Sequence, residues 1–213
     1  MIHDEVGGLP TRQRVEQYRG AISAVRSDDV VFGDAVHQRD YVVHFGAVAV
    51  VALDSHENML VIQQYRHPLA ARLWEIPAGL LDKPDEEPLT AAQRELAEEA
   101  GVLADEWSVL VDYATTPGGS TELLRIYLAR GLTELPERPM TEEAEEQDMP
   151  SRFVPLDEVS AAVLAGSVCN TSIVVGALAV RAARDAGWST LRPADAPWPM
   201  RDHLAASDRV FRA

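Results

Sequence analysis

The stretch GLLDKPDEEPLTAAQRELAEEAGV, residues 79–102, decides how the rest of the chain is interpreted. Its second half consists of strong helix formers. We expect Thr90 to cap this helix, because Gln93 stands three residues later in the capping-box position. Gly101 stands where a glycine commonly ends a helix. The apolar stripe at helical spacing is formed by Ala92, Leu96 and Ala100.

Three glutamates of this helix, Glu95, Glu98 and Glu99, are separated by three and four residues and therefore lie close together on its surface. Like charges one turn apart destabilise a helix by a few tenths of a kcal/mol unless they are neutralised. Mg²⁺ prefers carboxylate oxygens and keeps waters that phosphate oxygens can replace. A solvated acidic face is the alternative interpretation of such a cluster, and the flanking residues favour the metal.

The flanking residues resemble the Nudix box, a loop–helix–loop signature of hydrolases that cleave nucleoside diphosphates linked to another group. The family pattern is Gly-x5-Glu-x7-Arg-Glu-U-x-Glu-Glu-x-Gly-U, where U is a bulky aliphatic residue. Every specified position from Glu86 onward fits this pattern. Six residues instead of five separate Gly79 from Glu86, and we place the extra one in the Lys83–Pro84 loop.

The resemblance implies roles for the residues of the box. The implied metal ligands, for Mg²⁺ or alternatively Mn²⁺, are Glu95, Glu98, Glu99 and the backbone carbonyl of Ala78. Arg94 and Glu86 are expected to pair with each other and orient the helix. Gly79 and Gly101 are expected to be structural.

Other segments resemble the bacterial ADP-ribose pyrophosphatase subfamily, over roughly residues 15–186. They are His44–Val51, Tyr65–Pro68, Trp74–Gly79, Thr115–Glu122 around Pro117, and the acidic run Glu142–Met149. The implied substrate-binding residues are Arg39, Asp40, Arg66, Glu75, Leu80, Thr116 and Glu122. Three simpler interpretations stay open: an ordinary turn at Pro117, an ordinary ion pair for Arg66, and a structural carboxylate at Glu75.

The implied reaction is Mg²⁺-dependent hydrolysis of ADP-ribose to AMP and ribose 5-phosphate. In the subfamily the general base comes from the late acidic loop, which places it at Glu145, with Glu146 as the alternative and a merely solvated loop as the third possibility. A different nucleoside diphosphate derivative, such as a sugar nucleotide, NADH or a dinucleoside polyphosphate, is the nearest rival substrate. A non-catalytic nucleotide sensor is the rival from another class.

Composition narrows the class of protein. The 213 residues carry 34 acidic and 19 basic side chains, a net charge of −15. This charge argues against binding nucleic acid or an anionic membrane, both of which need basic patches. The single cysteine, Cys169, excludes an intramolecular disulfide. The first 20 residues show no secretory pattern, so we expect a cytoplasmic protein with a small-molecule substrate.

The order of predicted elements indicates an α/β protein, a Nudix α/β/α sandwich with a mixed sheet. Residues 1–44 are expected to form an N-terminal β-extension that builds a homodimer, beginning with a frayed segment to about residue 14. The hydrolase domain is expected over 45–190, and an irregular tail over 191–213.

Overall fold

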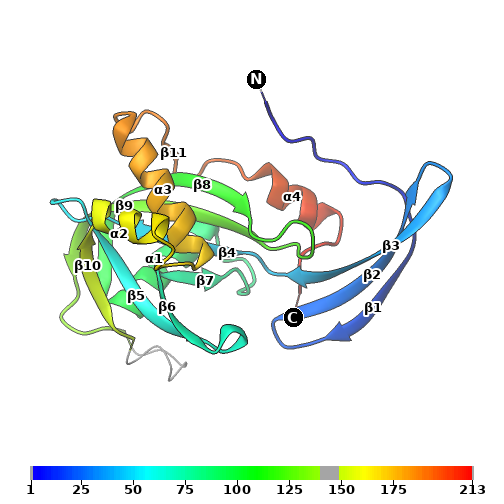
Figure 1. Cartoon of the computed structure of the whole chain (residues 1–213), viewed down its shortest axis with the longest axis horizontal. Coiled ribbons are helices and arrows are strands. Elements are labelled where there is room, and N and C mark those ends of the chain that lie inside the picture. Colours follow the sequence, from blue (N-terminus) through cyan, green and yellow to red (C-terminus); the bar gives the residue numbers. More distant parts are fainter. Residues whose placement is uncertain (1, 140–148, 213) are drawn as a thin grey trace. The chain divides into compact units, whose positions relative to one another are not determined.

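A computed structural model describes residues 2–139 and 149–212, which form a mixed α/β fold (Figure 1). Its strands are β1 (Thr11–Arg19), β2 (Ser23–Phe32), β3 (Ala35–His44), β4 (Ala47–Ala52), β5 (Asn58–Arg66), β6 (Ala71–Glu75), β7 (Ala78–Leu80), β8 (Val102–Ala114), β9 (Leu123–Glu134), β10 (Ser151–Pro155) and β11 (Arg192–Pro193). Its helices are the 3-10 turn η1 (His67–Leu69), α1 (Pro88–Ala100), α2 (Leu156–Leu164), α3 (Thr171–Asp185) and α4 (Pro199–Ala206).

The chain divides into two compact units. The first unit comprises Met1–Gly46, Tyr113–Leu124 and Pro197–Ala213, and the second comprises Ala47–Asp112 and Arg125–Ala196. Strands β8 and β9 run from one unit into the other. In the described part of the chain, no helix has both the length and the apolar character needed to cross a membrane.

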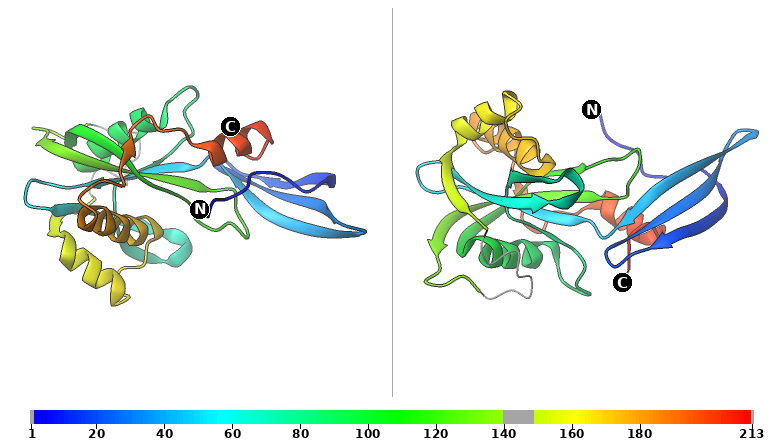
Figure 2. Two further views of the ribbon diagram at one scale, coloured as in Figure 1. Left: turned by 90° about the horizontal axis from the view of Figure 1, so that it is seen from above. Right: turned by 60° about the horizontal axis from the view of Figure 1, so that its bottom comes forward.

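The second unit has sheets between helical layers, which confirms the predicted sandwich. One sheet has the order β10-β5-β6, and the other has the order β11-β8-β9-β4-β7. Helix α1 packs on β4 and β7, whereas α2 and α3 cover the opposite side (Figures 1 and 2). Every residue of β4 is buried, as expected for a strand covered on both faces.

Helix α1 begins three residues earlier than the sequence suggested. Its N-cap is Glu87, and Thr90 lies inside the first turn, so the predicted capping box is wrong. Pro88 explains the shift, because its fixed φ suits the first helical position, where no amide hydrogen bond is lost. Gly101 ends the helix in the left-handed region at φ 66°, as predicted.

The extra residue of the box is absorbed by a turn before α1. The amide of Glu86 donates to the carbonyl of Lys83 over 3.3 Å, and Asp85 adopts a left-handed φ of 62°. Aspartate tolerates this region better than most residues do. The insertion therefore leaves the register of the helix unchanged.

In the first unit, β1, β2 and β3 form an antiparallel sheet. Strand β2 is continuous over ten residues and turns into β3 at Gly33 and Asp34. Strand β1 begins at Thr11, whereas a frayed segment was expected to about residue 14. Most side chains of this strand are polar and exposed, so no apolar pattern in the sequence indicated it.

The C-terminal residues are not the irregular tail that the sequence suggested. They contain α4, and the chain after it returns to β3, where the amide of Phe211 donates to the carbonyl of His44 over 3.1 Å. The Phe211 ring is buried edge-to-face against Phe45. Pro199 starts α4, at a position where proline is favoured.

Helix α3 approaches β4 through Gly176, where a Cβ atom would meet Val51 Cγ2 at 2.9 Å and Ile76 Cδ1 at 3.2 Å. We expect Gly176→Val to lower the free energy of unfolding by about 1–3 kcal/mol, because overpacking a well-filled core costs that much. Gly118→Ala is the control, since a Cβ there has nothing within 4 Å. Urea unfolding measures both variants, and equal stabilities would contradict the packing argument.

Candidate active site

Two of the box glutamates lie on the core-facing side of α1. Glu95 is 7% exposed and Glu99 is 3% exposed, and they share this face with Ala91, Ala92 and Leu96. The backbone amide of Ala78 donates to Glu99 Oε2 over 2.8 Å. At Gly79 a Cβ atom would overlap the carboxylate of Glu95, so a side chain there would displace this carboxylate. Strand β7 thus contacts both buried carboxylates through its backbone.

Arg94 connects the remaining carboxylates of the box. Its Nε and Nη2 donate to the two oxygens of Glu86 over 2.9 and 3.0 Å, which is the pairing that the box implied. Its Nη1 lies 2.7 Å from Glu95 Oε1 and 2.8 Å from Glu98 Oε2. The hydrogen bond from Arg94 holds the pKa of Glu86 below its usual value. The same carboxylates raise the pKa of Arg94.

The chemistry of this cluster suits a hard divalent cation. All of its donors are oxygens, and Mg²⁺ prefers such ligands. The backbone of β7 lies close to the same carboxylates at Ala78 and Gly79. A metal site that includes the Ala78 carbonyl requires this proximity. Across residues 2–139 and 149–212, no three Asp, Glu, His or Cys side chains are already grouped to hold a metal, since Glu95 and Glu98 face Arg94.

Arg66 and Glu75 form a pair with each other. Arg66 Nε and Nη2 donate to the two carboxylate oxygens of Glu75 over 2.9 and 2.7 Å. The Glu75 side chain is 1% exposed and the Arg66 side chain is 42% exposed. The buried carboxylate therefore fixes the orientation of the guanidinium. Leu80, the last residue of β7, is half-buried and lies opposite Ala47 of β4.

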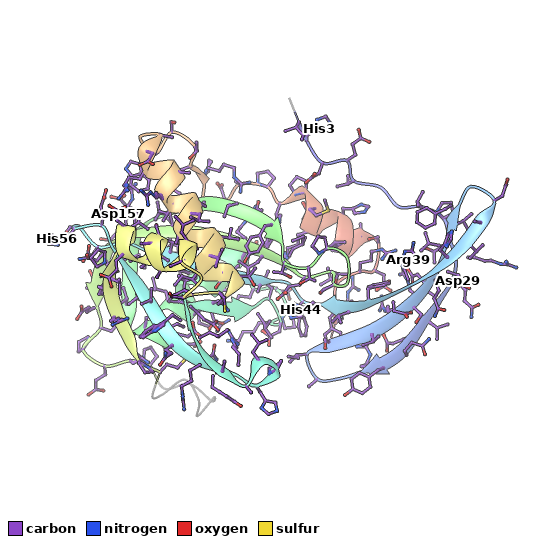
Figure 3. The ribbon with its side chains drawn as sticks, in the orientation of Figure 1. His3, Asp29, Arg39, His44, His56 and Asp157 are labelled. Carbon is purple, nitrogen blue, oxygen red and sulfur yellow. The ribbon has the colours of Figure 1, made fainter. Side chains whose placement is uncertain are left out.

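Arg39 and Asp40 lie on β3 in the first unit (Figure 3). Arg39 is exposed, donates to the carbonyl of Gln38 over 2.9 Å, and stands over the Phe32 ring at 5.5 Å. Asp40 accepts from the hydroxyl of Ser27 over 2.6 Å. Both side chains are thus held on the surface of the three-stranded sheet.

The loop that contains Thr116 and Glu122 is bound to the end of β3 in the same unit. The Val42 amide donates to the carbonyl of Gly119, and the Thr121 amide donates to the carbonyl of Val42, each over 2.9 Å. Ser120 forms a parallel bridge with Val42. The amides of Gly119 and Ser120 both donate to the carbonyl of Thr116 over 2.9 Å, which forms the turn at Pro117. The loop conformation is therefore set by β3.

Residues 43–168 match the NUDIX domain. The chain belongs to the Nudix family. The ADP-ribose pyrophosphatase of Mycobacterium tuberculosis (strain ATCC 25618 / H37Rv) is 44% identical over 196 residues, covering 92% of this chain and 93% of that protein. The ADP-ribose pyrophosphatase of Bacillus subtilis (strain 168) is 39% identical over 108 residues, 51% of this chain and 58% of that protein.

A solved structure described as an ADP compounds hydrolase matches this Nudix chain with a TM-score of 0.71. The match covers 87% of this chain and 99% of that one. The two sequences are 22% identical, so this likeness bears on the fold alone.

Sequence reasoning did not identify two residues beside Glu122. The Glu122 carboxylate accepts from the Thr115 hydroxyl over 2.6 Å and lies 3.7 Å from His44 Nδ1. The hydroxyl of Tyr113 is buried with no hydrogen-bond partner, and burial together with the charge of Glu122 raises its pKa. His44 lies on β3, which is distant from the loop in the sequence, and Tyr113 is an ordinary residue of β8, the strand that leads into the loop. No local pattern singles out either residue.

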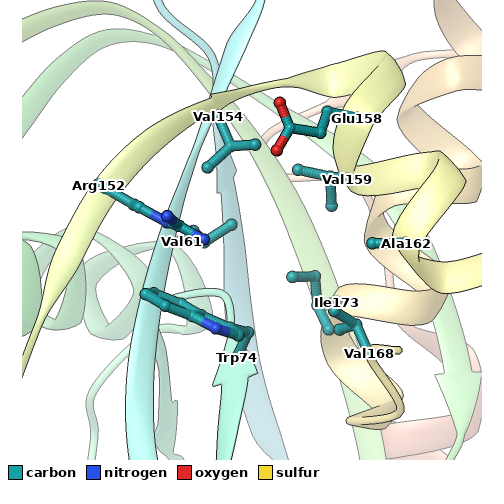
Figure 4. Close-up of a pocket in the computed structure, with 9 residues that line it drawn as sticks. All are labelled: Val61, Trp74, Arg152, Val154, Glu158, Val159, Ala162, Val168 and Ile173. Carbon is teal, nitrogen blue, oxygen red and sulfur yellow. The ribbon is translucent and has the colours of Figure 1, made fainter. Parts of the chain in front are cut away.

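A cavity of about 60 Å³ lies on the side of the sheets covered by α2 and α3 (Figure 4). Apolar side chains line most of the cavity. Arg152 and Trp74 also line it, and the Arg152 guanidinium lies 4.4 Å from the centre of the Trp74 ring. Among the residues that the structure describes, none of the predicted site residues lines this cavity. The predicted bases Glu145 and Glu146 lie outside the residues that the structure describes.

The pair between Arg94 and Glu86 makes stability depend on pH. Because the folded-state pKa of Glu86 is depressed, the pair stabilises the protein above the unfolded pKa, about 4.3, and is lost as pH falls through the folded value. We expect Glu86→Gln to cost about 1–3 kcal/mol at pH 7 and little at pH 3. Glu87→Gln, at an exposed neighbour, is the control. A pH-independent cost in urea unfolding would refute this account.

Proposed function

We propose that this Nudix chain hydrolyses the diphosphate of ADP-ribose to AMP and ribose 5-phosphate with Mg²⁺ as cofactor. The observation that carries the proposal is the 44% identity, over 92% of the chain, to a protein named ADP-ribose pyrophosphatase. The Thr115–Glu122 loop supports it, because this loop resembles the same subfamily and is held in a fixed conformation on β3.

In this proposal Glu95, Glu98, Glu99 and the Ala78 carbonyl hold the metal. Bound Mg²⁺ supplies neutralisation of the phosphate charge and lowers the pKa of water. The buried pair with Glu75 orients the guanidinium of Arg66 toward an anionic group of the substrate. A carboxylate, Glu145 or alternatively Glu146, accepts the proton of the attacking water.

The other candidate residues contribute binding. Thr116 and Glu122 present polar groups from the loop on β3, and Leu80 contributes an apolar surface at the end of β7. Arg39 and Asp40 bind substrate from the N-terminal sheet, and we propose that this sheet also builds a homodimer. A cytoplasmic location accompanies the proposal, since the single cysteine leaves no disulfide to form.

A substrate panel tests the proposal directly. We expect the full chain with Mg²⁺ to convert ADP-ribose to AMP and ribose 5-phosphate, identified by ion-pair chromatography and mass spectrometry. The same assay with a sugar nucleotide, NADH and a dinucleoside polyphosphate ranks the rival substrates by kcat/KM. Preference for one of these would replace ADP-ribose, and hydrolysis of none would favour a nucleotide sensor.

Two substitutions separate the base from the metal site. We expect Glu145→Gln to lower kcat by about 10²–10⁴-fold with little change in Mg²⁺ binding, because general-base catalysis contributes about that much. Glu99→Gln is expected to raise the Mg²⁺ concentration needed for half-maximal rate.

The matched controls are Glu137→Gln and Glu87→Gln, at exposed acidic positions outside the cluster. Near-normal kcat in Glu145→Gln together with a loss in Glu146→Gln would move the base by one residue. An unchanged metal requirement in Glu99→Gln would remove Glu99 from the metal site.

A further inference from the structure

We propose that Arg94 is the internal counter-ion that Glu95 and Glu98 exchange for the metal. Its Nη1 nitrogen holds the two carboxylates in the metal-free protein and releases them when a divalent cation binds, while Nε and Nη2 remain on Glu86. This inference rests on the metal site of the proposed function, and it makes Arg94 a positioning residue that limits the affinity for metal.

The nitrogens of the Arg94 guanidinium make two separate sets of contacts. Nε and Nη2 form a two-point contact with Glu86, and this parallel geometry is the strongest that arginine makes with a carboxylate. Nη1 is directed to the other side, 2.7 Å from Glu95 and 2.8 Å from Glu98. The Nη1 contacts can therefore be lost without losing the contact that fixes Arg94.

The charges of the cluster favour such an exchange. Glu86, Glu95, Glu98 and Glu99 bring four carboxylates to one helix and its preceding loop, and Arg94 is the cation that bonds three of them. One guanidinium does not neutralise this set. A divalent ion carries twice the charge of the whole guanidinium, and it binds several oxygens at once.

The surroundings of Glu95 and Glu99 restrict which of their contacts can be lost when a metal binds. The Gly79 backbone closes one side of the Glu95 carboxylate, and the Ala78 amide holds Glu99 Oε2. Both contacts come from β7, which is paired along its length with β4 in the core. The side chain of Arg94, 21% exposed, is the movable partner.

If Arg94 only orients the glutamates, its removal is expected to change the affinity for metal in the opposite direction. If Arg94 only holds the glutamates in place, its removal disorders the ligands and weakens metal binding. If Nη1 competes with the metal, its removal strengthens metal binding even though the metal-free protein loses stability. The sign of the change in Kd for Mg²⁺ therefore distinguishes the two roles.

Isothermal titration of the full chain with Mg²⁺ alone, without substrate, measures this sign. We expect Arg94→Met to lower the Kd by about fivefold or more, the ratio that corresponds to about 1 kcal/mol for a partly exposed ion pair. Lys83→Met is the matched control, because it removes one exposed cation from the same box. Its Kd is expected to change by less than about twofold, as for a surface charge. An unchanged or higher Kd in Arg94→Met, or an equal gain in Lys83→Met, would overturn the proposal.

Arginine side-chain NMR of the wild-type protein provides a second measurement that does not depend on the variant folding. On titration with Mg²⁺ we expect the Nη signals of Arg94 to shift or broaden, while its Nε–H signal stays protected by Glu86. A guanidinium whose signals do not change at saturating Mg²⁺ rules out the exchange. Neither experiment involves hydrolysis, so a protein that binds Mg²⁺ but leaves ADP-ribose intact would contradict only the proposed function.

Discussion

Glu95 and Glu99 are buried on the face of α1 that packs against β4 and β7. A buried carboxylate costs several kcal/mol unless it is paired and hydrogen-bonded, so the neighbouring elements have to supply partners. The Ala78 amide donates a hydrogen bond to Glu99, and the Arg94 guanidinium forms an ion pair with Glu95. These requirements fix the register of α1 against β7, and with it the position of every other residue of the box.

The same constraint explains both glycines of the box. Gly79 leaves room for the Glu95 carboxylate, which a side chain at that position would occupy. Gly101 ends α1 in a left-handed conformation, and its carbonyl accepts from the amide of Leu135 over 2.7 Å. The helix is therefore held at its end by Leu135, the residue after β9, and along its face by β7.

Local patterns predicted most of the second unit, because its elements carry their own start and stop signals. Apolar runs and helical spacing in the sequence predict a strand over 46–53 and helices over 156–165 and 171–186, and β4, α2 and α3 lie within one or two residues of these ranges. The box residues were predicted for the same reason, since a fixed spacing on one helix defines a face. The start of α1 was missed because Thr90 and Pro88 are competing signals, and the proline prevailed.

The first unit was harder to predict because its stability depends on contacts between distant residues. The Arg14 guanidinium pairs with the buried Asp28, and Arg209 from the C-terminal segment reaches the same carboxylate at 3.1 Å. Nothing within either segment indicates these partners. The loop of Thr116 was assigned by resemblance, but its attachment to Val42 depends on pairing that no local pattern encodes.

The candidate arginines already contact carboxylates or an aromatic ring, so the net charge of −15 affects how an anionic substrate can be bound. Arg94 is shared among three carboxylates, and Arg66 forms a two-point contact with Glu75. Arg39 is an exposed cation over an aromatic ring. A diphosphate brings further negative charge to a chain whose candidate arginines are already neutralised in part. In the proposed function, positive charge has to be supplied together with the substrate, and a hard divalent cation on the box glutamates would supply it where the carboxylates are concentrated.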